Sequence, residues 1–154
     1  MPAIDPVTLV ASVASDLVTN AGFPIAPKRT ELHVEPESFM PHECPQLAVW
    51  MGPTEYTLMD TGGGYQRQHH LFVAWTVYNA LEAETGGTGN AAAATELEAA
   101  MEPLTRRLAS YALSVPGALT PDVVATIVSE SREPTSGSEL QGKVELVVET
   151  LLGW

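Results

Sequence analysis

The fold of this protein is decided by one run in the middle of the chain, Gln66-Arg67-Gln68-His69-His70-Leu71-Phe72-Val73-Ala74-Trp75-Thr76-Val77-Tyr78. Alternate positions in this run place Phe72, Ala74 and Thr76 on one face and Leu71, Val73, Trp75 and Val77 on the other. An extended segment that is apolar on both faces toward its middle is typical of a buried strand. The run therefore predicts a central strand that is covered on both faces.

Shorter strands are expected on both sides of this run. Before it, the pattern predicts strands at Leu32–Glu35, Gln46–Met51 and Thr54–Met59, with a turn at Gly52-Pro53 between the last two. After it, strands at Asp122–Glu133 and Gly142–Leu152 are joined by the turn residues Pro134 to Ser138 and predict a hairpin. In the last strand apolar and charged residues alternate, which is typical of an antiparallel sheet with one solvated face.

Two helices are expected to cover the sheet. Asp5-Pro6 is a helix start and predicts a helix over Val7–Asn20. The run Ala91–Ala100 is rich in Ala, Leu and Glu, and Pro103 then predicts either a kink or the start of a second piece. The expected class is α+β, with one antiparallel sheet, two main helices packed against it, and a single domain over residues 1–154.

Composition excludes several classes of function. The chain has 154 residues, 19 of them acidic and 7 basic, and a net charge of −12. Such a charge opposes the phosphate contacts of a nucleic-acid-binding surface and disfavours an anionic membrane. The single cysteine, Cys44, cannot form an intrachain disulfide, and no signal peptide or membrane-spanning run is recognisable. We therefore expect the chain to fold in the cytoplasm.

No catalytic constellation is visible in the sequence. His42 and Cys44, with His33 nearby, are too few for a zinc site, and Cys44 has no patterned base beside it. The glycine clusters Gly62–Gly64 and Gly86–Gly89 match no phosphate-binding loop, and no lysine follows either. The sequence thus predicts no catalytic residue, no bound metal and no cofactor.

The order of these elements resembles a known family. It comprises a first helix at Pro6–Asn20, a Pro-rich crossover, the strand Gln46–Met51, the long strand quoted above, the Ala/Glu-rich helix, and a closing hairpin that ends with Leu140 to Glu149. This order is similar to that of the tail terminator (tail completion) proteins of long-tailed bacteriophages. The resemblance covers nearly the whole chain and rests on this pattern, because the family has no signature motif here.

The resemblance implies a structural role without catalysis. Such proteins form rings, commonly hexameric, that cap the tail tube, end its polymerisation and join the tail to the head connector or stopper protein. The implied partners are copies of the chain itself, the tail tube protein and that connector, while DNA passes through the lumen without specific binding. The implied location is the tail or neck of the virion, after synthesis in the host cytoplasm.

Three segments are candidate interfaces in such a ring. The Gly-rich tip contributes Asp60, Thr61, Gly62, Gly63, Gly64, Tyr65 and Arg67, the hairpin tip contributes Ser136, Gly137 and Ser138, and the apolar stretch Leu151-Leu152-Gly153-Trp154 contributes Trp154. Gly-rich tips on a firm sheet suit interfaces that become ordered on assembly. An ordinary solvent loop remains an equal interpretation of both tips.

Other functions stay open at this point. The chain could be another ring component of the neck or the tail tube. It could also be a small ligand-binding or enzymatic α+β domain with His42, Cys44 or the glycine loops at its site. A third alternative is a regulatory protein that sequesters a basic partner, because the chain is strongly acidic.

Overall fold

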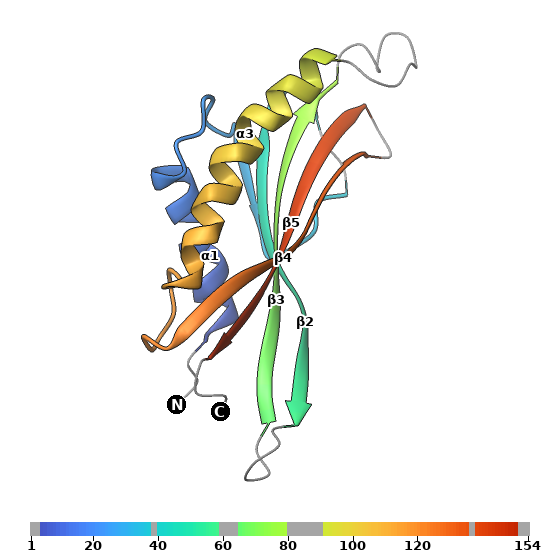
Figure 1. The fold of residues 1–154 in the computed structure, drawn as a ribbon. Coiled ribbons are helices and arrows are strands. Elements are labelled where there is room, and N and C mark those ends of the chain that lie inside the picture. Colours follow the sequence, from blue (N-terminus) through green and yellow to red (C-terminus); the bar gives the residue numbers. More distant parts are fainter. Residues whose placement is uncertain (1–3, 38–39, 59–64, 80–90, 136–137, 151–154) are drawn as a thin grey trace.

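The computed structural model describes residues 4–37, 40–58, 65–79, 91–135 and 138–150. Along the chain the elements are α1 (Pro6–Asn20), β1 (Arg29–Leu32), the short 3₁₀ turn η1 (Pro41–Glu43), β2 (Gln46–Leu58), β3 (Tyr65–Tyr78), α3 (Ala91–Ala109), the 3₁₀ turn η2 (Ser110–Ala112), β4 (Val123–Pro134) and β5 (Glu139–Thr150). Figure 1 shows α1 and α3 lying over one face of a strongly twisted sheet.

The sheet has five strands in the order β1-β2-β3-β5-β4, so β3 is central, as its sequence predicts. β3 pairs antiparallel with β2 and β5, and β4 pairs antiparallel with β5. The prediction of a purely antiparallel sheet is wrong for β1, which runs parallel to β2 from Arg29 opposite Gln46 to Leu32 opposite Val49. A parallel pair needs a crossover rather than a tight hairpin, and the Pro-rich segment 33–45 provides that connection. The α+β class itself is confirmed.

The core lies between the helices and one face of the sheet. It includes Leu71, Val73, Trp75 and Val77 of β3, all at most 1% exposed, together with Leu9, Val13 and Leu17 of α1 and Leu97, Met101, Leu104 and Leu108 of α3. On the opposite face a smaller cluster contains Ala48, Trp50 and Ala74, with Phe72 packed against it. The prediction that β3 is buried on both faces holds near its middle, but helices cover only one of them.

β2 is one long strand, whereas its sequence predicted two strands separated by a turn at Gly52-Pro53. The register shifts between Met51 and Thr54, which identifies a bulge at Gly52 and Pro53. Proline is tolerated in a bulge because no ladder hydrogen bond is lost there. The Phe72 ring also occupies the space beside Gly52, where an added Cβ would lie 2.5 Å from Phe72 Cε2. Because the missing side chain makes room for that ring, the pair Gly52-Pro53 bends the strand without ending it.

Two further boundaries differ from those predicted. β1 lies at Arg29–Leu32 rather than Leu32–Glu35, because His33 adopts a positive φ of 71° and turns the chain away. α3 continues through Pro103 to Ala109 as one helix, so the alternative of a second helical piece that starts there is wrong. Its buried stripe of leucines and Met101 lies against the sheet on both sides of the proline, and packing of this kind outweighs a local helix-breaking preference.

We predict that Gly117→Ala destabilises the protein much more than Gly22→Ala. Both glycines have positive φ, +81° and +77°, so alanine is strained by about 1 kcal/mol at either position. An added Cβ at Gly117 would also lie 2.7 Å from the Ser12 Cβ of α1, whereas nothing lies within 4 Å at Gly22. Denaturant unfolding is expected to show a loss of about 3 kcal/mol for Gly117→Ala. Equal losses in the two variants would contradict this packing of the segment against α1.

Candidate functional site

Three of the predicted interface residues belong to the described part of the chain, and they lie at opposite ends of the sheet. Tyr65 begins β3 opposite Leu58, and Arg67 is exposed on the same strand opposite Tyr56. Ser138 lies at the other end, where its carbonyl accepts the Asn79 N–H at 2.8 Å. The other predicted interface residues fall outside the described residues, and they are Asp60, Thr61, Gly62, Gly63, Gly64, Ser136, Gly137 and Trp154. Because β3 runs between the two ends, the structure keeps these candidate surfaces apart.

The end that carries Arg67 is a two-stranded ribbon, which we define as residues 56–58 of β2 and 65–67 of β3, beyond the last described pair of β3 with β5 at Gln68. Figure 1 shows it extending past both helices. Tyr56 is 64% exposed on it, next to the exposed Glu55. Sequence reasoning selected Arg67 but missed Tyr56, since alternation in a predicted strand does not reveal where the helices stop covering it. An exposed tyrosine opposite an exposed arginine is typical of a protein interface, where both residue types are enriched.

The face of the sheet without helices, here called the outer face, carries an aromatic pair. The rings of Trp50 and Phe72 are stacked with centroids 5.4 Å apart and an interplanar angle of 15°. The Lys143 ammonium lies 5.7 Å from the Phe72 centroid and 3.8 Å from a carboxylate oxygen of Glu35. A residue from the crossover after β1 thus contacts β5 across the outer face, while Ala74 of β3 is buried there by the cluster that contains Trp50 and Phe72.

Acidic residues on the outer face lie beside polar side chains of the neighbouring strand β3. His70, whose side chain is 16% exposed, has Nε2 3.4 Å from Glu55 Oε1 and Nδ1 3.6 Å from Glu145 Oε1. Gln68 donates from Nε2 to Glu149 Oε2 at 3.1 Å. These contacts join β2, β3 and β5 where the ribbon leaves the sheet. The polar side chains therefore hold the three strands together at the base of the ribbon.

The candidate reactive residues His33, His42 and Cys44 are not arranged as a catalytic or metal-binding site. His42 is exposed in η1, and the backbone N–H of His33 donates to the Val49 carbonyl at 2.9 Å. Cys44 is buried, and burial, followed by nearby carboxylates such as Glu139, raises the pKa of its thiol to about 11. A thiol with this pKa is neutral near pH 7, the opposite of an activated nucleophile. In the part of the chain that the structure describes, no three His, Cys, Asp or Glu side chains are grouped to hold a metal ion. Both glycine clusters lie outside that part.

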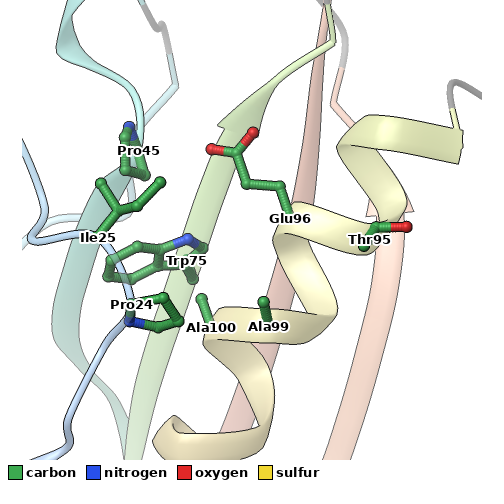
Figure 2. A pocket seen from close by; sticks show the side chains of 8 residues that line it. All are labelled: Pro24, Ile25, Pro45, Trp75, Thr95, Glu96, Ala99 and Ala100. Atoms are coloured by element: carbon green, nitrogen blue, oxygen red, sulfur yellow. The ribbon is translucent and has the colours of Figure 1, made fainter.

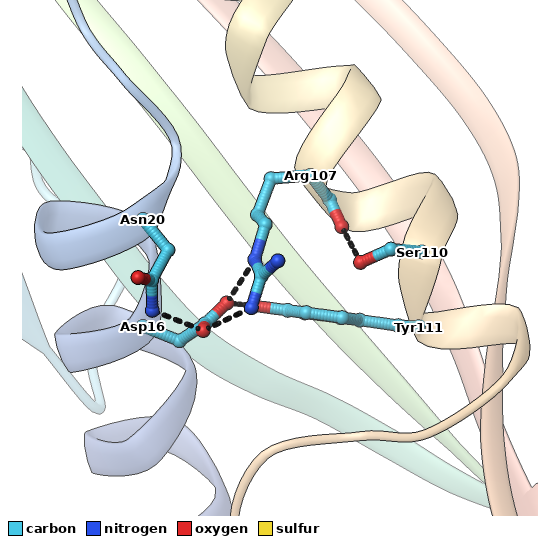
Figure 3. Close-up of polar contacts among 5 residues, drawn as sticks. All are labelled: Asp16, Asn20, Arg107, Ser110 and Tyr111. Atoms are coloured by element: carbon cyan, nitrogen blue, oxygen red, sulfur yellow. Dashed lines mark hydrogen bonds and ion pairs between the residues drawn. The ribbon is translucent and has the colours of Figure 1, made fainter.

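A polar cluster that sequence reasoning missed fastens α1 to the end of α3 (Figure 3). Asp16 accepts two hydrogen bonds from Arg107, at 2.9 and 2.7 Å, one from the Tyr111 hydroxyl at 2.6 Å and one from Asn20 at 2.9 Å. The Asp16 side chain is only 9% exposed. The hydrogen bonds from Arg107 are the main reason that the pKa of Asp16 falls to about 2. Burial and the hydrogen bond to Asp16 raise the pKa of Tyr111.

Comparisons with known proteins add one finding. No family model matches the sequence, and no curated protein matches it. The structure is similar to a chain in the solved virion of a native gene transfer agent (GTA) particle, with a TM-score of 0.56 and 13% sequence identity. The match covers 92% of this chain and 93% of that chain, so the two share a fold over nearly their whole length. Among the described helices, none combines the length and apolarity needed to cross a bilayer.

We predict that Asp16→Asn destabilises the protein in a pH-dependent way. Because the pKa of Asp16 is lowered from its usual 3.8 to about 2, its ionised form stabilises the fold above pH 4. That contribution is lost as the pH falls from about 4 to about 2. Since Arg107 is 36% exposed and solvent screens part of its attraction, we expect a loss of about 1–2 kcal/mol at pH 7.

The control for this experiment is Glu102→Gln. Glu102 pairs with Arg106 at 2.7 Å, but both side chains are exposed, by 76% and 69%, so the pair is expected to contribute little. Urea unfolding curves recorded from pH 2 to pH 7 give the free energy of unfolding of the unmodified protein, Asp16→Asn and Glu102→Gln. A deficit of Asp16→Asn that stays constant below pH 4 would contradict the role assigned to the ionised carboxylate.

Proposed function

We propose that this protein is a structural component of a phage-type virion that forms a ring, with six copies, at the top of the tail tube. The ring ends tube polymerisation and joins the tail to the head connector or stopper protein. Its partners are copies of itself, the tail tube protein and that connector. It acts in the tail or neck of the virion, and no side chain transforms a substrate.

The observation that carries this proposal is the fold shared with a chain of the gene transfer agent virion over 92% of this chain. The element order seen in the sequence leads to the same class of protein. Because a fold alone does not define a function, the assembly geometry must also suit this role.

The two separated ends of the sheet suit a ring. A closed ring of identical subunits uses two different patches on each subunit, one for each neighbour. The ribbon supplies one such patch, and the surface near Ser138 lies at the other end of the molecule. A net charge of −12 also suits a DNA conduit, since acidic walls do not retain phosphate groups.

The shared fold equally supports a neighbouring role, as another neck ring or a tail tube subunit, and one experiment separates the three. Light scattering at several concentrations measures the copy number, and electron micrographs with purified tail tube protein show where the rings bind. Hexameric rings at one end of tubes, with tube growth arrested, are the expected result. Incorporation along the tube would identify a tube subunit, and rings that bind only the connector would identify another neck component. A monomer that turns over a small molecule would overturn the structural role.

We predict that Arg67→Glu weakens assembly while Arg106→Glu does not. Both arginines are exposed, but Arg67 lies on the ribbon and Arg106 on α3, where it pairs with Glu102. In a chain with 7 basic and 19 acidic residues, a basic group on the ribbon is attracted to the acidic surface of a neighbouring subunit. The concentration needed for half-assembly, measured by sedimentation, is expected to rise at least about tenfold for Arg67→Glu. An equal effect of both variants would show that only net charge matters.

A further inference from the structure

An apolar cavity opens between α3, the segment after α1 and the central strand. Its volume is about 160 Å³. Figure 2 shows its walls, which are the carbon-rich side chains of Pro24, Ile25, Pro45 and Ala99 around the ring of Trp75. Ile25 is 53% exposed at this site. An apolar cavity of about 150 Å³ accommodates a group the size of a benzene ring, so one Leu or aromatic side chain suits this one.

The side chain of Trp75 gives the cavity a hydrogen-bond donor that lacks an acceptor. The residue is 1% exposed, and its indole Nε1 has no hydrogen-bond partner. Figure 2 shows this nitrogen on the side of the ring that faces Glu96 and Pro45. A buried N–H without an acceptor costs about 1–3 kcal/mol, which an incoming carbonyl would recover. The chemistry of the cavity therefore selects an extended peptide segment with an apolar side chain and a free main-chain carbonyl.

We propose that this cavity holds the segment Leu151-Leu152-Gly153-Trp154 of a neighbouring copy of the chain. The segment has three large apolar side chains and no charged side chain. That absence of charge matters because the protein carries a net charge of −12 and Glu96 lines the cavity, so an acidic segment would be repelled. Gly153 also leaves neighbouring carbonyls accessible to a donor such as Trp75 Nε1.

The register of the sheet indicates that the segment comes from another copy. Trp75 lies opposite Gly142 in β5, and β5 then runs away from the cavity to Thr150. At about 3.3 Å per residue, Thr150 is about 26 Å beyond Gly142. The four residues that follow reach at most about 14 Å when fully extended. The segment therefore falls short of the cavity in its own chain, and a second chain must supply it.

This contact joins one end of a subunit to the other end of the next. Such head-to-tail contacts use two different patches and generate a closed ring when the rotation closes. The inference rests on the self-assembly in the proposed function and assigns a specific part of its interface. The segment Leu151-Leu152-Gly153-Trp154 would act in addition to the ribbon, which lies at the same end of the sheet as the end of β5.

A disulfide experiment tests the pairing directly. A chain with Thr95→Cys is mixed with a longer, tagged chain with Leu152→Cys, and mild oxidant is added before a non-reducing gel. Thr95 is exposed and lines the cavity, whereas Ala94 is exposed on the same helix and does not line it. We expect a mixed-size dimer with Thr95→Cys and at least about tenfold less of it with Ala94→Cys. The natural Cys44 is buried, and the unmodified chain serves as its control.

A second pair of variants tests the same contact without a cross-link. Ala99→Trp fills the mouth of the cavity from an exposed helix position, and Ala94→Trp adds the same ring elsewhere on α3. We expect the concentration for half-assembly to rise at least about tenfold for Ala99→Trp and to stay within about twofold for Ala94→Trp. Circular dichroism and unfolding curves establish that both variants are folded.

The outcomes separate this inference from the proposed function. Oligomers of unchanged size that form no mixed disulfide and tolerate Ala99→Trp would overturn the inference and leave the ring intact. Loss of tail tube binding in Ala99→Trp, with the oligomer unaffected and no disulfide, would assign the cavity to the tube protein and also overturn the inference. A chain that stays monomeric at every concentration and does not bind tubes would overturn both.

Discussion

The structure depends on the pairing of β3 with β2 along one edge and with β5 along the other. Pairs involving β3 extend from Leu58 opposite Tyr65 at one end to Glu139 opposite Tyr78 at the other. The register with β5 is unbroken, and the register with β2 shifts only at the Gly52-Pro53 bulge. This pairing defines the inner face, where the helices bury the core, and the outer face, where Trp50 stacks on Phe72. A slip of one residue would exchange these faces, so every other contact requires this register.

The helices add stability and orientation to this sheet. The apolar stripes of α1 and α3 are buried against the sheet, but apolar contacts alone are non-directional and do not fix the orientation of a helix. The hydrogen bonds from Arg107 and Tyr111 to Asp16 orient the two helices, because a bidentate contact between a guanidinium and a carboxylate allows little rotation of one group against the other. The end of α3 is thereby fixed relative to α1, and the N-terminal half of α3 forms one wall of the cavity at Trp75.

Several elements could be predicted because their causes are local. Alternation identified the central strand and the closing hairpin, and Asp5-Pro6 marked the start of α1. Pro103 left two predictions open for α3, and the continuous helix contradicts the second start, since the cost of the proline is outweighed by leucines that pack on a sheet distant in sequence. Gly52-Pro53 misled the prediction for β2, because a turn and a bulge use the same residues and only the partner strand distinguishes them.

By itself, the sequence determined the α+β class, the acidic charge and the position of β3, all of which follow from composition and period. The tertiary structure alone decided the parallel pairing of β1, the Asp16–Arg107–Tyr111 cluster and the cavity at Trp75. Each of these joins groups that are far apart along the chain, and residue patterns carry no information on such distances. The exposed Tyr56 belongs with them, since exposure depends on where the helices end over the sheet.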